Sequence, residues 1–583
     1  MSPEERFLAE LRTGRSLEGV TVASLDLRGR DLSGAQLPGA KLDNVNLEGA
    51  NLRGANLRGA QMTSCSLARA DLEEAHLEGA AFALVGLAGA SLRGARLEGA
   101  RFMGLDLSGA NLEGAQLQAT TLLRSRLVGA QLPGADLTGA RLDFADLEGA
   151  NLDRTTLLRT SFSRANLTRA SLRGARINES SFAGTRLHHA DLGDATIEAV
   201  IFAQADLRGA TLPKSLQKCF FDEAILTRRD LAEDDPRAAE LPGVALGPLD
   251  LEGTNLSFAS FRGVSFRGAN LRKTRLELCN LSECDLEGAE FHGADLRRAI
   301  FSRARLHGVD FSEQDLEMTT LDEADLSGAR FTGARLVMTM LSRANLTDAD
   351  LTRAFLSSAI MSEAVLDRVI LDKTSFRGVS FDNVDLTGMH LQGLSMVYCS
   401  FVSANLAAMN LVGCDFECSD FTRADLRRAD LAGANLKQAN LKEARLEVAN
   451  LSGVKGKGAF FGEAVLTGAK LSEAALRYAT FTRADLTHAN LAAADLRETQ
   501  MVAVRAEGAL FNSARLDYSD LSHADLRATD FSSADLFSAN LHAVRDEGAV
   551  WIGASLRAAR RTDEDLLEAE TWLPPSSSSS PRT

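Results

Sequence analysis

Residues 135–139 read Ala-Asp-Leu-Thr-Gly, and residues 50–54 read Ala-Asn-Leu-Arg-Gly. The unit is a small residue, then Asp, Asn or another polar residue, then Leu, then two mostly polar or glycine positions. From Leu17 to Leu212 every fifth residue is Leu, Phe, Ile, Val or Met. A second tract from Leu251 to Leu556 keeps this rule except at three positions. A period of five residues therefore decides the fold.

Neither a regular helix nor a regular strand accommodates this period. Five helical steps of about 100° rotate a side chain by about 140°, which scatters the leucines around the helix. Five strand steps place successive leucines on opposite faces. The chain must therefore turn a corner in every pentapeptide, so that each Leu points to one central axis. The glycine two positions after the Leu suits such a corner, and the alanine two positions before it points into a narrow interior.

The phenylalanines give the number of corners in one turn. The core phenylalanines of the first tract are separated by multiples of twenty residues, and the second tract has two sets with this spacing on opposite faces. The predicted core ladder is Phe82, Phe102, Phe162, Phe182 and Phe202, then Phe261, Phe301, Phe381, Phe401, Phe421, Phe461 and Phe481. The opposite set is Phe291, Phe311, Phe331, Phe511, Phe531 and Trp551. Four pentapeptides therefore make one coil with a square cross-section.

This pattern resembles the pentapeptide-repeat family, whose consensus is A-(D/N)-L-X-X, over about nine-tenths of the chain. The resemblance implies a right-handed quadrilateral parallel β-helix. We therefore expect an all-β solenoid of about 25 coils of 20 residues, with short helical caps at both ends. The handedness comes from the family, whereas the inward Leu and Ala and the length of the coil follow from the sequence.

The N-terminal segment 1–16 carries a helix signal. Ser2 before Pro3, with a Glu three positions after Ser2, is a capping box and predicts a helix over Pro3–Arg12. The side chains expected to cover the first coil are Phe7, Leu8 and Leu11. The sequence therefore predicts a capped N-terminal end.

A second helix signal lies in the segment 557–573. Thr562 and the acidic residues after it predict the helix start, and Pro574 ends it before a disordered tail over 574–583. The side chains expected to face inward are Leu566, Leu567, Trp572 and Leu573. This helix is predicted to cap the last coil. The resemblance leaves open that it forms a dimer instead, so the chain is expected to be a monomer or a dimer through this helix.

The two tracts, 17–212 and 251–556, differ in phase. Phe221 lies nineteen residues after Phe202, so one residue is lost within Pro213–Phe220. Residues 232–248 contain three prolines and an acidic run, which predict an irregular segment. The interval 213–250 is interpreted as a kink in a continuous rod, and two solenoids that move independently are the alternative.

Three stretches replace the inward Leu: Lys455–Gly458, Arg505–Gly508 and Arg545–Gly548. Each is followed by an aromatic residue at the next core position, and we expect a bulged corner at each. Such a bulge would interrupt a smooth wall and offer a partner a binding point. The candidate partner-binding residues are Lys455, Lys457, Arg505, Glu507, Arg545 and Glu547.

The sequence carries no sign of catalytic chemistry. Six of the seven cysteines take the inward small position, where a thiol replaces alanine, and Cys418 alone lies near a corner. The nine histidines form no ligand cluster with metal-binding spacing. Phosphate-loop, nucleophile-elbow and dinucleotide motifs are missing, and a filled prism leaves no cleft. We therefore predict no enzyme activity, no catalytic residue, no cofactor and no metal.

The net charge of −15 disfavours direct binding to nucleic acid or anionic membranes. The sequence shows no signal peptide and no membrane-spanning run, so we expect a cytoplasmic bacterial protein. A rigid rod of this kind is predicted to bind or scaffold other proteins, whose identity the sequence does not give. The resemblance adds two alternatives. One is an accessory or cargo protein of a bacterial secretion system, and the other is a DNA mimic that binds type II topoisomerase.

Overall fold

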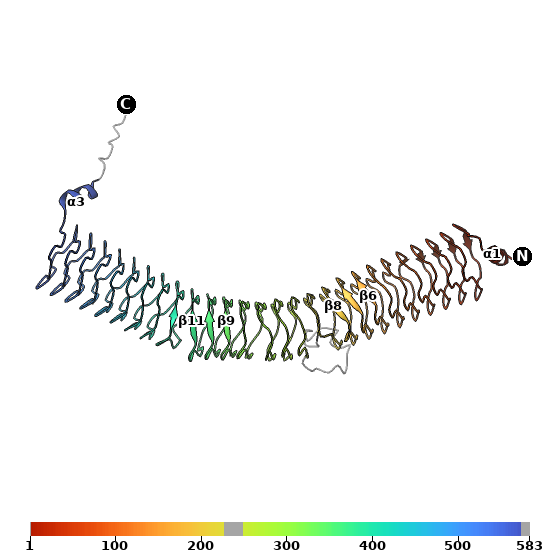
Figure 1. Cartoon of the computed structure of the whole chain (residues 1–583), viewed down its shortest axis with the longest axis horizontal. Coiled ribbons are helices and arrows are strands. Elements are labelled where there is room, and N and C mark those ends of the chain that lie inside the picture. Colours follow the sequence, from red (N-terminus) through yellow and green to blue (C-terminus); the bar gives the residue numbers. More distant parts are fainter. Residues whose placement is uncertain (1, 227–248, 573–583) are drawn as a thin grey trace, which may run out of the picture. The chain divides into compact units, whose positions relative to one another are not determined.

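The structure, a computed structural model, describes residues 2–226 and 249–572. The chain divides into two compact units, Met1–Val309 and Asp310–Thr583, and each is described by itself. In both units successive coils follow the chain order, as Figure 1 shows. The boundary between the units falls inside the second repeat tract. The tract boundaries given by the repeat pattern stay predictions.

Backbone hydrogen bonds to the neighbouring coils define each pentapeptide. In Ala135–Gly139 the N–H of Leu137 donates to the carbonyl of Thr156 on the next coil at 2.9 Å. The carboxylate of Asp136 accepts from the N–H of Thr138 at 2.9 Å, which closes the corner and explains the preference for Asp or Asn before Leu. Gly139 takes the left-handed conformation at the corner, with a φ of 68°. The local sequence thus builds one side of the square.

The ladders are parallel throughout, and nearly all paired residues lie twenty positions apart, for example Val22 with Leu42. The first unit contains α1 (Pro3–Arg12), β1 (Thr21–Ala23), β2 (Lys41–Asp43), β3 (Gln61–Thr63), β4 (Ala81–Ala83), β5 (Arg101–Phe102), β6 (Thr156–Leu158), β7 (Arg176–Asn178) and β8 (Thr196–Glu198). The second contains β9 (Arg335–Val337), β10 (Phe355–Ser357), β11 (Ser375–Arg377), β12 (Met396–Val397) and α3 (Glu564–Thr571). Strands β1–β5, β6–β8 and β9–β12 form three sheets, and isolated parallel bridges form the other rungs. The predicted quadrilateral parallel β-helix with two short helices is confirmed.

Stacked side chains fill the interior. Every phenylalanine of the predicted core ladder is buried. Phe82 stacks on Phe102 with ring centroids 4.5 Å apart, and Phe461 stacks on Phe481 at 4.7 Å. Each such pair contributes about 0.5–1.5 kcal/mol beyond the burial of its surface. The small residue two positions before the core residue, most often Ala, is buried in nearly all coils, so the interior is filled.

The register slip lies within the first unit. Glu198 pairs with Gln217 and Ile201 with Phe220, each nineteen residues later, whereas the pairs before these are twenty residues apart. Phe221 then stacks on both Phe202, at 4.8 Å, and Phe261, at 4.6 Å. Residues 215–220 pair directly with 255–260, so the flanks of the interval pack as one stack. The predicted irregular segment 232–248 lies outside the described residues.

The two helices dock differently. Helix α1 has the predicted capping box, in which Ser2 and Glu5 exchange backbone-to-side-chain hydrogen bonds, and it buries Phe7. Helix α3 begins after its N-cap Asp563 and buries no side chain. Leu566 is 47% and Trp572 66% exposed, so their predicted inward packing is wrong. Leu573 and the predicted tail lie outside the described residues. Among the residues that the structure describes, no helix has the length and apolar character needed to cross a membrane.

Candidate functional site

The three stretches that lack an inward Leu keep a regular backbone. Lys455 pairs in register with Asn435 and Ala475, and the N–H of Gly456 donates to the carbonyl of Ala475 at 2.9 Å. Regular pairing also continues through the other two stretches. The predicted bulges are therefore wrong. At Gly456 the side chain of Leu476 occupies the vacant volume, since a Cβ on Gly456 would lie 2.7 Å from Cδ2 of Leu476.

Arg505 and Arg545 lie on one face, two coils apart, with Asp525 on the coil between them. Arg505 pairs with Asp485 at 3.5 Å, and Arg545 pairs with Asp525 at 3.7 Å. Opposite charges therefore alternate up this face. We call Asp485, Arg505, Asp525, Arg527, Arg545 and their partner Glu507 the arginine ladder.

Arg527 is the centre of the arginine ladder. Its guanidinium contacts Asp525 at 2.8 Å and Glu507 at 2.7 Å. The hydrogen bond to Asp525, with the nearby charges of Glu507 and Glu547, raises the pKa of Arg527. The same bond lowers the pKa of Asp525. Four of the predicted partner-binding residues thus lie on a face whose charges largely neutralise one another.

Lys455 and Lys457 lie on a different face, in a groove of about 500 Å³. The groove exists because the corners Gly413 and Gly433 lack side chains and Ala475 is small. Its lining residues are Gly413, Cys414, Asp415, Gly433, Asn435, Lys437, Lys455, Lys457 and Ala475. We call this feature the lysine groove.

The cations of the lysine groove differ in their partners. Lys437 donates to Glu417 at 2.6 Å, and this bond raises the pKa of Lys437. Lys455 and Lys457 form no ion pair with any residue that the structure describes, and both are exposed. The groove therefore presents two ammonium groups whose charge is not neutralised.

An aromatic ring adjoins these cations. The Nζ of Lys457 lies 5.5 Å, and the Cζ of Arg477 4.6 Å, from the centre of the Tyr478 ring. The chain's three tyrosines, Tyr398, Tyr478 and Tyr518, take the same corner position in their coils and are all exposed. Tyrosine and arginine are the residue types that most often dominate the affinity of protein interfaces. The groove and this edge therefore combine charge with exposed aromatic surface.

The cysteines are free thiols held in the interior. Six are buried, and Cys418 is half-buried. Burial raises the pKa of Cys219 to about 12 and that of Cys399 to about 11. These thiols stay protonated near neutral pH, so they pack as small apolar groups rather than react.

Two polar clusters have no counterpart in the sequence analysis. In the first unit, hydrogen bonds from His188 and Arg208 lower the pKa of Asp206 to about 2, although burial opposes this. The distances to its carboxylate are 2.6 and 2.5 Å, and the cluster braces the coil next to the register slip. In the second unit, His523 and His542 meet a glutamate of α3. The sequence signal for each cluster is a spacing of about twenty residues, between His188 and Arg208 in the first and between His523 and His542 in the second.

Comparisons with known proteins agree with this architecture. A family model described as "Pentapeptide repeat region" matches residues 374–451. A second, "Pentapeptide repeats (8 copies)", matches residues 31–67, 65–104, 87–122, 106–143, 115–154, 140–178, 160–198, 249–277, 279–317, 315–348, 349–388, 464–501 and 507–543. A search of curated proteins finds no match.

Three solved structures illustrate the likeness. HetL from the cyanobacterium Nostoc sp. strain PCC 7120 is 32% identical over 36% of this chain and 97% of its own, with a TM-score of 0.26. Full-length QnrB1, a plasmid-mediated fluoroquinolone resistance protein, is 18% identical over 39% of this chain and 93% of its own, with a TM-score of 0.17. Rfr23 from the cyanobacterium Cyanothece 51142 is 22% identical over 24% of this chain and 95% of its own, with a TM-score of 0.14.

Proposed function

Because the chain belongs to the pentapeptide-repeat family, we propose that it is a non-enzymatic, protein-binding rod whose lysine groove binds an acidic segment of a partner protein. The observation that carries the proposal is the unpaired charge of Lys455 and Lys457 within one groove, whereas Arg505 and Arg545 of the arginine ladder are matched by carboxylates. Repeat solenoids present long, rigid surfaces of this kind to partners.

The chemistry of the groove favours an extended acidic chain. Lysine ammonium groups attract carboxylates as point charges, and two of them lie together in this groove. The ring of Tyr478 adds apolar area at the edge of the lysine groove. The cationic groups of Lys457 and Arg477 lie over this ring and hold it in place. An Asp- or Glu-rich peptide with an apolar side chain would meet both features.

The two alternatives from the sequence remain predictions. DNA mimicry needs a continuous acidic face, and arginines alternate with the carboxylates of the arginine ladder. No feature of the described residues favours an accessory role in secretion. The absence of a catalytic role is proposed because the interior is filled and the site contains no nucleophile paired with a base.

The test is the affinity of the full chain for a fluorescent oligoglutamate peptide, measured by anisotropy. The variant Lys455→Gln/Lys457→Gln is expected to bind at least about tenfold more weakly, which corresponds to about 1.4 kcal/mol. The matched control Arg505→Gln/Arg545→Gln also removes two positive charges and is expected to bind like the wild type.

Added salt should weaken the wild-type binding, because the attraction is electrostatic. Equal losses in both double variants would contradict a site at the groove. If the protein bound an oligothymidine more tightly than the acidic peptide, the proposed protein partner would be wrong and a single-stranded nucleic acid would be the better candidate.

A further inference from the structure

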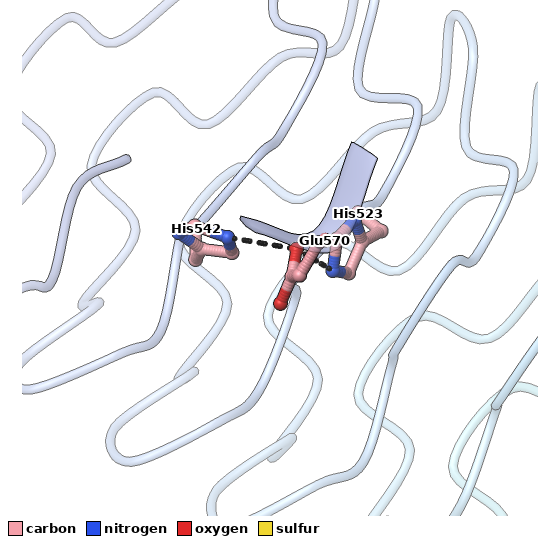
Figure 2. A group of neighbouring side chains, drawn as sticks. All are labelled: His523, His542 and Glu570. Atoms are coloured by element: carbon pink, nitrogen blue, oxygen red, sulfur yellow. Dashed lines mark hydrogen bonds and ion pairs between the residues drawn. The ribbon is translucent and has the colours of Figure 1, made fainter. Parts of the chain in front are cut away.

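We propose that His523, His542 and Glu570 form a binding site for a divalent transition-metal ion, with zinc as the best-suited class, and that the ion fixes helix α3 to the wall of the solenoid. Figure 2 shows the three side chains converging, with the carboxylate of Glu570 between the two imidazoles. We call them the His–His–Glu cluster. The lysine groove and its proposed partner play no part in this inference.

The distances suit tetrahedral coordination. Oε2 of Glu570 lies 3.3 Å from Nε2 of His523 and 3.2 Å from Nε2 of His542. Zinc bonds of about 2.0–2.2 Å in a tetrahedron place neighbouring ligand atoms about 3.3–3.5 Å apart. The distances from Glu570 to the two histidines are therefore already close to those expected between ligand atoms of a zinc ion. All three ligand atoms lie within 4.8 Å, and a small rotation of the exposed His523 would shorten the remaining edge.

Two of the ligands stand on a rigid support. His523 and His542 follow the buried core residues Leu521 and Leu541 on neighbouring coils, and their ring centres are 5.5 Å apart. The His542 side chain is only 8% exposed, so packing fixes its ring. Metal sites built on rigid elements keep their geometry better than sites on loops.

The third ligand comes from α3, which has little other attachment. Glu570 lies in the last turn of the helix, and no residue of the helix is buried. An ion between Glu570 and the two histidines would therefore hold the helix where apolar packing does not. Imidazole nitrogen with one carboxylate is a donor set that suits zinc, copper or nickel rather than calcium or magnesium.

Binding of a metal ion would change the hydrogen bonding of His542. The backbone N–H of Asp563, the N-cap of α3, donates to Nδ1 of His542 at 3.2 Å. A neutral ring then carries its proton on Nε2 and donates it to Glu570. An ion bound at Nε2 would require the single proton of the neutral ring on Nδ1 instead, where it would displace the hydrogen bond from Asp563. Metal binding is thus coupled to the start of α3.

The first experiment titrates zinc chloride alone into the full-length, untagged, chelator-treated protein by calorimetry. We expect one saturable zinc ion per chain at this site. Glu570→Gln and His523→Gln should each weaken it at least about tenfold. The matched control is His488→Gln, which alters another exposed histidine of the same unit and should leave the affinity unchanged. All variants keep the seven cysteines, so binding by thiols would be the same in each.

A second readout follows the helix itself. Arg561 lies between the last rung of the solenoid, at Arg560, and the start of α3, so zinc should slow trypsin cleavage after Arg561 in the wild type and not in Glu570→Gln. The proposal is overturned if zinc shows no saturable binding, which would leave an ion pair only. It is also overturned if the variants bind zinc like the wild type, or if bound zinc gives no protection from trypsin.

Discussion

The lysine groove and the arginine ladder begin from the same sequence defect and reach opposite electrostatic outcomes. In both, a basic residue precedes a position where the inward Leu is missing. Arg505 has Asp485 and Asp525 as its in-register neighbours, whereas Lys455 has Asn435 and Ala475. The first cation is neutralised and the second is not.

The difference shows where the properties of a surface are decided in a solenoid. Outward residues lie in register with the residues twenty positions before and after them, so neighbouring coils supply much of their surroundings. A local motif therefore does not define a binding site. The composition of three successive coils does.

The largest effect is expected in the core beneath the groove. Leu476→Ala should lower the free energy of unfolding by about 2–5 kcal/mol, toward the upper end, because Gly456 on the adjacent coil offers no side chain to fill the cavity. Leu496→Ala is the matched control, since its in-register neighbours are both leucines. Hydrogen exchange at these coils is the suitable measurement, because long repeat arrays do not unfold as one unit. Equal costs for the two variants would mean that Leu476 does not compensate for Gly456.

Most of the fold follows from the sequence because one spacing rule governs it. The inward Leu, the corner Asp and the stacking of Phe82 on Phe102 each depend only on position within a coil of twenty residues. The bulges were mispredicted for a physical reason. A β-bulge requires an extra backbone residue, and exchanging Leu for Gly456 removes a side chain while leaving the number of residues unchanged.

The candidate sites follow from the sequence only in part. Lys455 and Lys457 stand out as departures from the repeat, but their lack of partners depends on small residues on other coils. The His–His–Glu cluster has still less signal. His523 and His542 are nineteen residues apart, one short of the coil length, and Glu570 belongs to a helix outside the repeat. No periodicity predicts where such a helix docks.

The arginine ladder should respond to acid. The hydrogen bond from Arg527 lowers the pKa of Asp525 below its ordinary value of 3.8, against the opposing effect of burial. A carboxyl whose pKa is lower in the folded state stabilises the fold above its unfolded pKa, and this contribution is lost as the pH falls through the folded pKa. The stability of the wild type should therefore fall more steeply below about pH 4 than that of Arg527→Gln. Thermal unfolding between neutral pH and pH 3 measures this.

The acid effect is expected to be small because water still reaches part of both side chains of the pair and screens their attraction. At neutral pH the variant should lose at most about 1 kcal/mol, and high salt should reduce the loss. Lys455→Gln in the groove is the comparison variant, and its acid profile should follow the wild type because Lys455 has no carboxylate partner among the described residues. Parallel acid profiles for wild type and Arg527→Gln would show that Asp525 gains nothing from Arg527.

The smallest effect is expected when a carboxylate is introduced beside Lys455 in the lysine groove. Ala475→Asp places a carboxylate on the coil next to Lys455, at the in-register position that Asp525 has beside Arg505. We expect about a twofold to fivefold loss of affinity for the oligoglutamate peptide, since an exposed ion pair contributes about 0.2–1 kcal/mol. Ala475→Asn has a similar size without the charge and should bind nearly like the wild type. If both variants weaken binding equally, the volume of the groove controls recognition. If only the aspartate does, the unpaired charge of Lys455 controls it.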